Sequence, residues 1–392
     1  MRAIMADRSV AAIIGLALLV NLGTGMVLPV LPLFARSFGV DYGEAGLLVA
    51  AFYFARLVFD LAAGPVLNRL GIGSSAAAGL LVLAAGAALT GLSRSFLLAV
   101  ISWAVAGAGA AVVWAAMYNG LIRSVPKARM ARTLSLFYGA FNGGIVAGGF
   151  LGGLIAARLG LAAPFFLLAV IAVGLAVYMK AVVLDQPGQQ TSTVEPQALR
   201  ALSLFRIPGY SAAVVSLLAN LWLFGAVFST LVPLFARDVL GLSPFEIGVL
   251  YAVSLAAEFI AYLPAGRWAD SRGRRFTLLP AFACLSVTVL VLGWSTNPLL
   301  FAGLLALLGV GSAFAGVPPT AILADVVPAN RSASGVAIFR FGGDLGFFLG
   351  PLIAGVAAAS VGFKAAFAIA GIPSIVALAI VARSRETLIR ET

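Results

Sequence analysis

The sequence predicts an all-α membrane protein of twelve transmembrane helices, arranged as two pseudo-symmetric six-helix bundles. Three observations lead to this prediction. The 392 residues are 62% hydrophobic and only 10% charged, which leaves too little polar surface for a soluble protein of this length. Apolar segments long enough to cross a bilayer recur along the chain. The second half of the chain repeats the pattern of the first.

Twelve apolar segments follow one another, and most are close to the ~20 residues that a helix needs to cross a bilayer. Glycine and proline occur inside many of them, as membrane helices tolerate. Polar loops separate the segments, whose approximate limits are 10–34, 45–67, 75–92, 96–122, 133–157, 162–183, 209–236, 246–266, 277–294, 298–324, 334–359 and 364–382. We therefore expect twelve helices embedded in a lipid bilayer.

The repeat relates the two halves residue by residue. Glu44 opens the second segment, and Glu246 opens the eighth segment 202 residues later. Several glycines keep the same offset. The sequence LPLFAR, which ends at Arg36, corresponds to VPLFAR, which ends at Arg237. Two copies of a bundle with an even number of helices have parallel orientations in the membrane.

Lysine and arginine concentrate in the loops on one side of the predicted membrane. Of the 25 basic residues, eighteen lie in loops on the side of the N-terminus, five in the opposite loops and two within segments. The positive-inside rule therefore predicts a multi-pass cell-membrane protein with both termini in the cytoplasm. The net charge of +11 reflects this topology, and we expect no nucleic-acid binding.

The longest polar stretch marks the boundary between the two copies. It includes DQPGQQTSTVEPQ, a composition typical of a flexible linker. We therefore predict an N-terminal six-helix bundle over 1–184, a cytoplasmic linker over 185–208 and a C-terminal six-helix bundle over 209–392. Within the linker, 198–206 is a candidate amphipathic helix on the membrane surface.

The residue types that the chain lacks limit its chemistry. It has no histidine, and its single cysteine, Cys284, lies inside an apolar segment. We therefore expect no metal site and no cofactor, and proton chemistry must use carboxylates. A membrane enzyme or a sensor would be a different class of function. No nucleophile–base set and no nucleotide-binding loop can be recognised, so we expect that the chain is not an enzyme.

Two motifs indicate a family. The loop after the eighth segment carries a glycine, an acid, a second glycine and two arginines, which we call the loop motif: Gly266, Asp270, Gly273, Arg274 and Arg275. The copy after the second segment is degraded, because Asn68 stands in place of the acid. The fifth segment carries a glycine series that the eleventh repeats with its proline: Gly144, Gly148, Gly152 and Gly153, then Gly346, Gly350, Pro351 and Gly355.

With these motifs, the chain resembles the major facilitator superfamily of secondary transporters, and within it the twelve-span drug:proton antiporters. The resemblance implies that spans one, four, seven and ten line a central cavity. These spans carry no charge in their interiors but offer aromatic and neutral polar side chains: Asn21, Thr24, Trp114, Tyr118, Asn119, Asn220, Trp222, Phe224 and Phe228. Such a lining suits a lipophilic ligand oriented by one or two hydrogen bonds. The alternative is that several of the aromatic rings face lipid or pack between helices.

Five ionisable residues lie inside the predicted spans, where charge is costly and indicates function. Arg56 and Asp60 in span two, and Arg340 and Asp344 in span eleven, form pairs spaced one helical turn apart. The resemblance implies that these spans pack together, so we predict a gating network in which Asp60 meets Arg340 and Arg56 meets Asp344. The alternative is that each pair neutralises itself within its own helix.

Glu258 has no basic residue within helical reach. A carboxyl group inside a membrane without a nearby cation can be held in its protonated form near neutrality. Glu258, with Asp344 as a second candidate, is therefore the predicted proton-coupling site. The alternative is a permanently protonated side chain that is hydrogen-bonded to a neighbouring helix.

Together these features predict a monomeric secondary transporter that works by alternating access. We expect proton-coupled export of lipophilic or weakly cationic small molecules. The alternative is a symporter or facilitator of a neutral metabolite or a lipid-like molecule.

Overall fold

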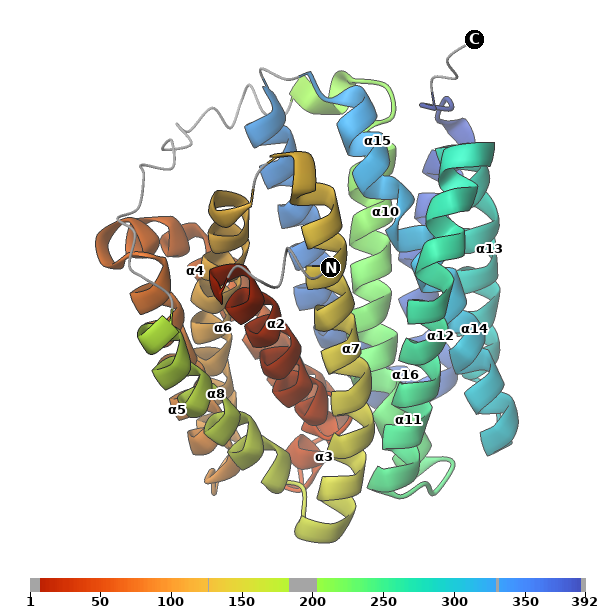
Figure 1. The fold of residues 1–392 in the computed structure, drawn as a ribbon. Coiled ribbons are helices and arrows are strands. Elements are labelled where there is room, and N and C mark those ends of the chain that lie inside the picture. Colours follow the sequence, from red (N-terminus) through yellow and green to blue (C-terminus); the bar gives the residue numbers. More distant parts are fainter. Residues whose placement is uncertain (1–7, 126, 183–202, 329–330, 389–392) are drawn as a thin grey trace. The chain divides into compact units, whose positions relative to one another are not determined.

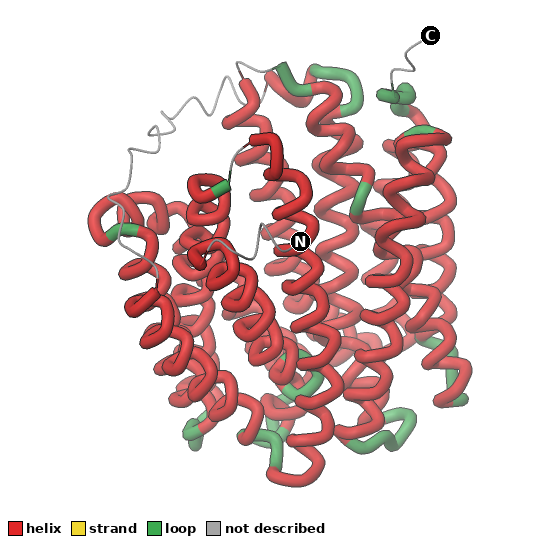
Figure 2. The backbone as a smooth tube through the Cα atoms, viewed as in Figure 1, coloured by secondary structure: helices red, strands yellow, loops and turns green. Residues whose placement is uncertain are grey.

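The computed structural model describes residues 8–125, 127–182, 203–328 and 331–388. Throughout these ranges the chain forms helices joined by short loops, with no strand (Figures 1 and 2). Of the predicted linker, the structure describes only 203–208, and the first part of the candidate surface helix lies outside the described residues. Its last part, η1 (Ser203–Arg206), is a single 3₁₀ turn with Leu204 buried.

The helices of the first half begin with a long first span in two pieces, α2 and α3. They are α2 (Arg8–Val27), α3 (Leu31–Arg36), α4 (Tyr42–Leu70), α5 (Ile72–Gly91), α6 (Phe96–Ser124), α7 (Lys127–Leu159) and α8 (Ala163–Val182). In the second half the seventh span consists of α10 (Tyr210–Leu223), η2 (Phe224–Leu231) and α11 (Val232–Asp238). The remaining helices are α12 (Pro244–Arg272), α13 (Arg274–Leu292), α14 (Pro298–Gly316), α15 (Pro318–Val326) and α16 (Ser332–Arg383).

The predicted spans are present among the described residues. Eleven stretches of helix there are long and apolar enough to cross a membrane, and the last of them, within α16, contains predicted spans eleven and twelve. The two are separated at Gly362, whose backbone (φ 81°, ψ 169°) is not helical. A positive φ of this kind is readily adopted only by glycine, so Gly362 provides the turn between the two spans.

Equivalent signals start the second span of each half. Glu44 accepts a hydrogen bond from the Asp41 backbone, and Glu246 accepts one from the Ser243 backbone. The backbone N–H of each glutamate in turn reaches the side chain of the earlier residue. These are reciprocal capping boxes, which satisfy backbone donors that a helix leaves free at its start.

Span seven contains an unusual segment. η2 is a π-helix, in which the Thr230 hydroxyl donates to the Gly225 carbonyl oxygen five residues earlier (3.0 Å). Pro233, just beyond it, has no N–H and its ring clashes with the carbonyl four residues before it, which disturbs the helix there. The related sequence around Pro32 in span one gives a break between α2 and α3 instead.

The contacts divide the chain into two compact units. The first comprises 1–40, 51–192 and 242–252, and the second comprises 41–50, 193–241 and 253–392. In the first unit α2 packs on α7, and in the second α10 packs on α16 (Figure 1). Glycines permit both contacts, because a Cβ at Gly148 would lie 2.3 Å from the Leu22 oxygen, and one at Gly350 would lie 2.8 Å from the Trp222 oxygen. The glycine series therefore serves close helix packing.

Candidate functional site

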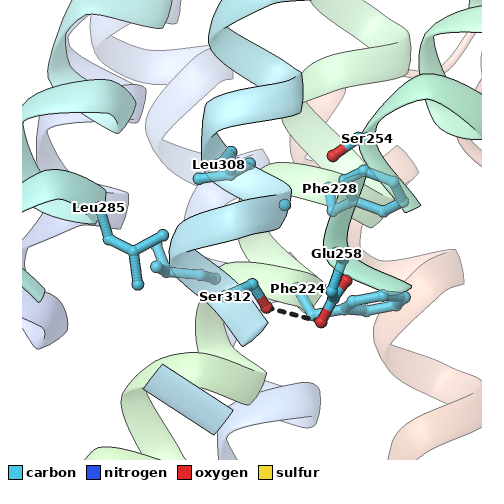
Figure 3. Close-up of a pocket in the computed structure, with 9 residues that line it drawn as sticks. Phe224, Phe228, Ser254, Glu258, Leu285, Leu308 and Ser312 are labelled. Carbon is cyan, nitrogen blue, oxygen red and sulfur yellow. Dashed lines mark hydrogen bonds between the residues drawn. The ribbon is translucent and has the colours of Figure 1, made fainter. Parts of the chain in front are cut away.

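Glu258 lies in the second unit, on α12, with two neutral donors around its carboxyl group. The Ser312 hydroxyl on α14 donates to Glu258 Oε1 at 2.9 Å (Figure 3). The Tyr262 hydroxyl, one turn along α12, donates to the same oxygen at 3.0 Å. Among the described residues no donor reaches Oε2 and no cation contacts the carboxyl group. Oε2 is therefore the oxygen at which a proton can be added without breaking a hydrogen bond.

A third helix joins this group through Ser312. The Ser312 hydroxyl also lies 3.2 Å from Asn220 Oδ1, near the end of α10. The backbone N–H of Phe224, where the π-helix η2 begins, is bonded to the carbonyl oxygen of Asn220. A polar chain thus runs from Tyr262 and Glu258 on α12 through Ser312 on α14 to Asn220 on α10.

A close approach of α12 and α14 holds these groups together. A Cβ at Gly309 would lie only 2.1 Å from the Ser254 carbonyl oxygen and 3.1 Å from the Glu258 nitrogen. The Ser254 hydroxyl donates across the same contact to the Leu305 carbonyl oxygen at 2.7 Å. Gly309 and Ser312 lie on the same face of α14, since residues three apart are neighbours on a helix. The glycine therefore brings the serine within reach of the carboxylate.

The carboxyl group faces a small cavity with a mostly apolar lining. Its walls are formed by Leu223, Phe224, Phe228, Ser254, Glu258, Leu285, Leu308, Gly309 and Ser312 (Figure 3). The cavity volume of about 20 Å³ is enough for a single water molecule. Phe224 and Phe228 contact each other, with ring centres 5.2 Å apart. At this size the cavity fits a proton or a water molecule rather than a whole organic substrate.

The predicted ligand-contacting residues of span seven have different surroundings. Phe224 and Phe228 line the cavity, and Asn220 joins the polar chain. Trp222 is buried, and its indole N–H donates to the Ala370 carbonyl oxygen on α16 at 3.1 Å. The polar atom of Trp222 is thus used inside the second unit, and its contact with a substrate remains a prediction.

The predicted polar residues of the first unit bond to their own helices. The side chains of Asn21, Thr24 and Asn119 donate to carbonyl oxygens one turn earlier, at 2.8–2.9 Å. Tyr118, on α6, is half-buried. An amide that donates in this way still has an oxygen that can accept a hydrogen bond, and contact of these residues with a ligand stays a prediction.

Trp114 has an unexpected neighbour in the same unit. The Arg56 guanidinium lies 5.8 Å from the centre of its ring, within the range of a cation–π contact. Trp114 also packs against the rings of Phe137 and Phe141. Arg56 is therefore stabilised partly by an aromatic ring, which its spacing from Asp60 did not reveal.

The four charges of the predicted gating network lie in helices, with the expected one-turn spacing. Arg56 and Asp60 are in the part of α4 that belongs to the first unit, whereas Arg340 and Asp344 are on α16 in the second. Pairing across the two units stays a prediction, as does a proton-coupling role for Asp344.

The loop motif connects several helix ends of the second unit. Arg274 Nη1 lies 2.5 Å from Asp270, and its Nε lies 3.5 Å from Asp325 on α15. Gly273 has φ 118°, a conformation that favours glycine, and precedes the first residue of α13. Gly273 and Asp270 of the loop motif thus have definite structural roles. A Cβ at Gly266, in contrast, would meet no atom within 4 Å.

Glu386, which the sequence did not single out, caps α13. Its carboxylate accepts hydrogen bonds from the backbone N–H groups of Arg274 (2.9 Å) and Arg275 (3.0 Å). Burial raises the pKa of Glu386, but backbone donors outweigh it and hold the pKa below its ordinary value; these donors are Leu388, Arg274, Arg275 and Thr387. An acid at the N-terminus of a helix also interacts favourably with the helix dipole.

Comparison with known proteins settles the family. A family profile described as Major Facilitator Superfamily matches residues 13–253 and, in an overlapping second match, 217–389. The chain belongs to the major facilitator superfamily. The quinolone resistance protein NorA of Staphylococcus aureus is 26% identical over 238 residues, which cover 59% of this chain and 59% of NorA.

Two further comparisons cover nearly the whole chain. The MFS-type transporter MJ1560 of Methanocaldococcus jannaschii is 21% identical over 91% of this chain and 92% of that protein. A crystal structure of the nucleoside transporter NupG superposes with a TM-score of 0.78 at 15% identity, covering 95% of this chain and 99% of that one. The chain thus has the major facilitator fold, with helices long and apolar enough to cross a membrane.

Besides Glu386, sequence reasoning missed the partners of Glu258. Tyr262 follows it by four residues, so helical spacing alone could have indicated this contact. Ser312 carries only a weak signal, a hydroxyl three residues after a glycine in an apolar segment. Its meeting with Glu258 depends on the packing of α12 against α14, which no local pattern specifies.

Proposed function

We propose that this transporter couples proton entry to the export of lipophilic or weakly cationic small molecules, with Glu258 as the proton site. The observation that supports this best is the set of contacts around Glu258, whose partners are the neutral hydroxyls of Ser312 and Tyr262. A carboxylate paired with arginine keeps its charge, whereas one held by neutral donors in an apolar site can gain and lose a proton.

The cavity next to Glu258 fits this role. It has room for about one water molecule, so a proton can reach the carboxyl group when the site opens to solvent. Phe224 and Phe228 exclude bulk water at other times. Protonation then removes a charge from the apolar interior, which lowers the cost of moving the second unit between its two facing states.

Export of lipophilic compounds is favoured by the neutral residues of spans one, four and seven and by the likeness to NorA, a quinolone resistance protein. Their aromatic and amide groups suit apolar ligands with few polar atoms. We further propose that the protein acts as a monomer in the cell membrane with both termini in the cytoplasm, where the basic loops would lie.

Transport into proteoliposomes of known orientation tests this function. A fluorescent lipophilic cation should accumulate against its gradient when the lumen is acidic, and accumulation should collapse when a protonophore dissipates the pH difference. Equilibration that ignores the pH difference would contradict proton coupling and favour facilitated diffusion. Accumulation of a neutral metabolite along the proton gradient would favour the symporter.

A further inference from the structure

The Ser312 hydroxyl lies within hydrogen-bonding distance of two acceptors on different helices. Glu258 Oε1 on α12 is 2.9 Å away, and Asn220 Oδ1 on α10 is 3.2 Å away. A serine has one hydroxyl hydrogen, so it donates fully to only one acceptor at a time. Ser312 can therefore donate its hydrogen fully to Glu258 or to Asn220, but not to both.

The protonation state of Glu258 determines which of the two acceptors receives the Ser312 hydrogen. The ionised carboxylate accepts hydrogen bonds only, and bonds to a charged acceptor are the stronger ones, so it takes the Ser312 hydrogen. When Oε2 is protonated, Oε1 becomes an uncharged carbonyl oxygen and a weaker acceptor, so the Ser312 hydrogen can turn to the amide oxygen of Asn220. The proton itself stays on Glu258, and only the hydroxyl rotates.

Asn220 is placed to pass this change to span seven. Its backbone oxygen receives the N–H of Phe224, the first residue of η2. Its side-chain amide is confined by α14, since a Cβ at Gly316 would lie 3.0 Å from Asn220 Nδ2. Segments of π-helix are rare and often mark functional sites in helices, so a bond gained at Asn220 acts next to the irregular part of the span.

We propose that Ser312 is a positioning residue that relays the protonation state of Glu258 to Asn220 and hence to the π-helical segment of span seven. The inference rests on the proposed role of Glu258 and identifies how that role reaches the helix expected to line the substrate path. Among the described residues that face Glu258, Tyr262 is the one other titratable group. α10, α13 and α14 present Asn220, Leu285 and Ser312, which carry no charge.

Hydrogen–deuterium exchange of the η2 amides tests the relay without any transport assay. Glu258→Gln mimics the protonated state, because it removes the negative charge from the acceptor that faces Ser312. Measured at one pH on the purified protein, Glu258→Gln should change exchange in η2 by roughly two- to tenfold, the effect of one hydrogen bond. In a Ser312→Ala background the same substitution should change nothing in η2, and Ser312→Thr, which keeps the hydroxyl, should restore the effect.

Asn220→Ala provides a second route if Ser312→Ala does not fold, since it removes the acceptor and should also abolish the response. An equal response to Glu258→Gln with and without Ser312, or no response at all, would overturn the relay. The outcome is separate from that of the proposed function, because the exchange measurement needs neither substrate nor gradient. If the wild-type protein shows no proton-coupled transport in liposomes while the hydrogen–deuterium exchange response of η2 is present, only the transport proposal is refuted.

Discussion

At the scale of single residues, the site depends on which groups surround one carboxyl group. Glu258 accepts two hydrogen bonds from neutral hydroxyls and lies against aromatic rings. Neutral donors stabilise the ionised form only moderately, and the apolar surroundings oppose it. The proposed coupling requires that these effects balance at a pH that a cell maintains.

Removing one donor should move that balance in a defined direction. Tyr262→Phe deletes a hydrogen bond to the ionised form of Glu258 but keeps the ring, so protonation becomes easier at higher pH. The pH at which proton-driven transport is half-maximal should rise by about one unit, the equivalent of one hydrogen bond. Tyr178→Phe, on an exposed position of α8, is the matched control. An unchanged pH profile would exclude Tyr262 from the coupling step.

The isolation of Glu258 could be predicted from the sequence, because cations three or four residues away would have been visible. Its partner Ser312 could not, since that contact is made by packing of α12 on α14 at Gly309. Glu386 was missed for a similar reason, because it follows the last span and meets α13 more than a hundred residues earlier in the chain.

At the scale of the helices, the repeat predicted that the two halves have corresponding spans, but it did not predict the local structure within each copy. LPLFAR and VPLFAR are nearly the same sequence, yet one follows a break between α2 and α3 and the other follows a π-helix. Proline signals that the helix is disturbed but does not say how the freed carbonyl groups are satisfied. Similarly, the sequence did not distinguish Gly362 from the other glycines, and only the structure shows that its positive φ separates spans eleven and twelve.

The contact between α12 and α14 provides a test at this scale. Gly309→Ala adds a Cβ that would clash with the Ser254 carbonyl oxygen, so the helices must separate. We expect a loss of about 1–3 kcal/mol in stability, typical of overpacking, together with impaired proton coupling. Gly303→Ala on the same helix has open space around the new methyl group and should change neither. Equal thermal unfolding of the two variants would show that Gly309 does not hold the helices together.

The cap on α13 predicts a pH-dependent contribution to stability. The pKa of Glu386 is lower in the folded protein than its ordinary value of 4.5, so its stabilisation is present above pH 4.5. It is lost as the pH falls through the lowered value. Glu386→Ala should therefore cost about 1–2 kcal/mol at pH 7, as for loss of a helix cap, and less in acid.

Thermal unfolding in detergent across this pH range measures the effect. Arg385→Ala is the control, because its side chain makes no hydrogen bond among the residues that the structure describes. A destabilisation of Glu386→Ala that is as large at pH 3 as at pH 7 would contradict the ionic cap.

At the scale of the whole molecule, alternating access requires contacts that form in one facing state and break in the other. The two charge pairs of spans two and eleven are candidates for such contacts. Asp60 precedes Arg69 by nine residues, and Arg340 follows Arg331 by nine, so both are ~13 Å from the loops that anchor them. Arg56 and Asp344 lie one turn deeper. Antiparallel helices would therefore place opposite charges at matching heights.

This arrangement predicts coupling between Arg56 and Asp344. Asp344→Asn should leave a buried charge without compensation, at a cost of ~3–5 kcal/mol in the state closed to the cytoplasm, and so favour the inward-open form. Adding Arg56→Gln should partly restore the balance. Accessibility of introduced cysteines from each side, in a double-mutant cycle, measures this. Additive effects of the two substitutions would support neutralisation within each helix instead.

The central claim, that Glu258 carries the coupled proton, is tested most directly by comparing exchange with accumulation. Glu258→Gln in proteoliposomes should still exchange labelled for unlabelled substrate, because exchange needs no proton release, but should not accumulate substrate under a pH gradient. Glu246→Gln is the matched control on the same helix, since glutamine also serves in a capping box and both activities should persist. Gradient-driven accumulation by Glu258→Gln at the level of the control would contradict the claim.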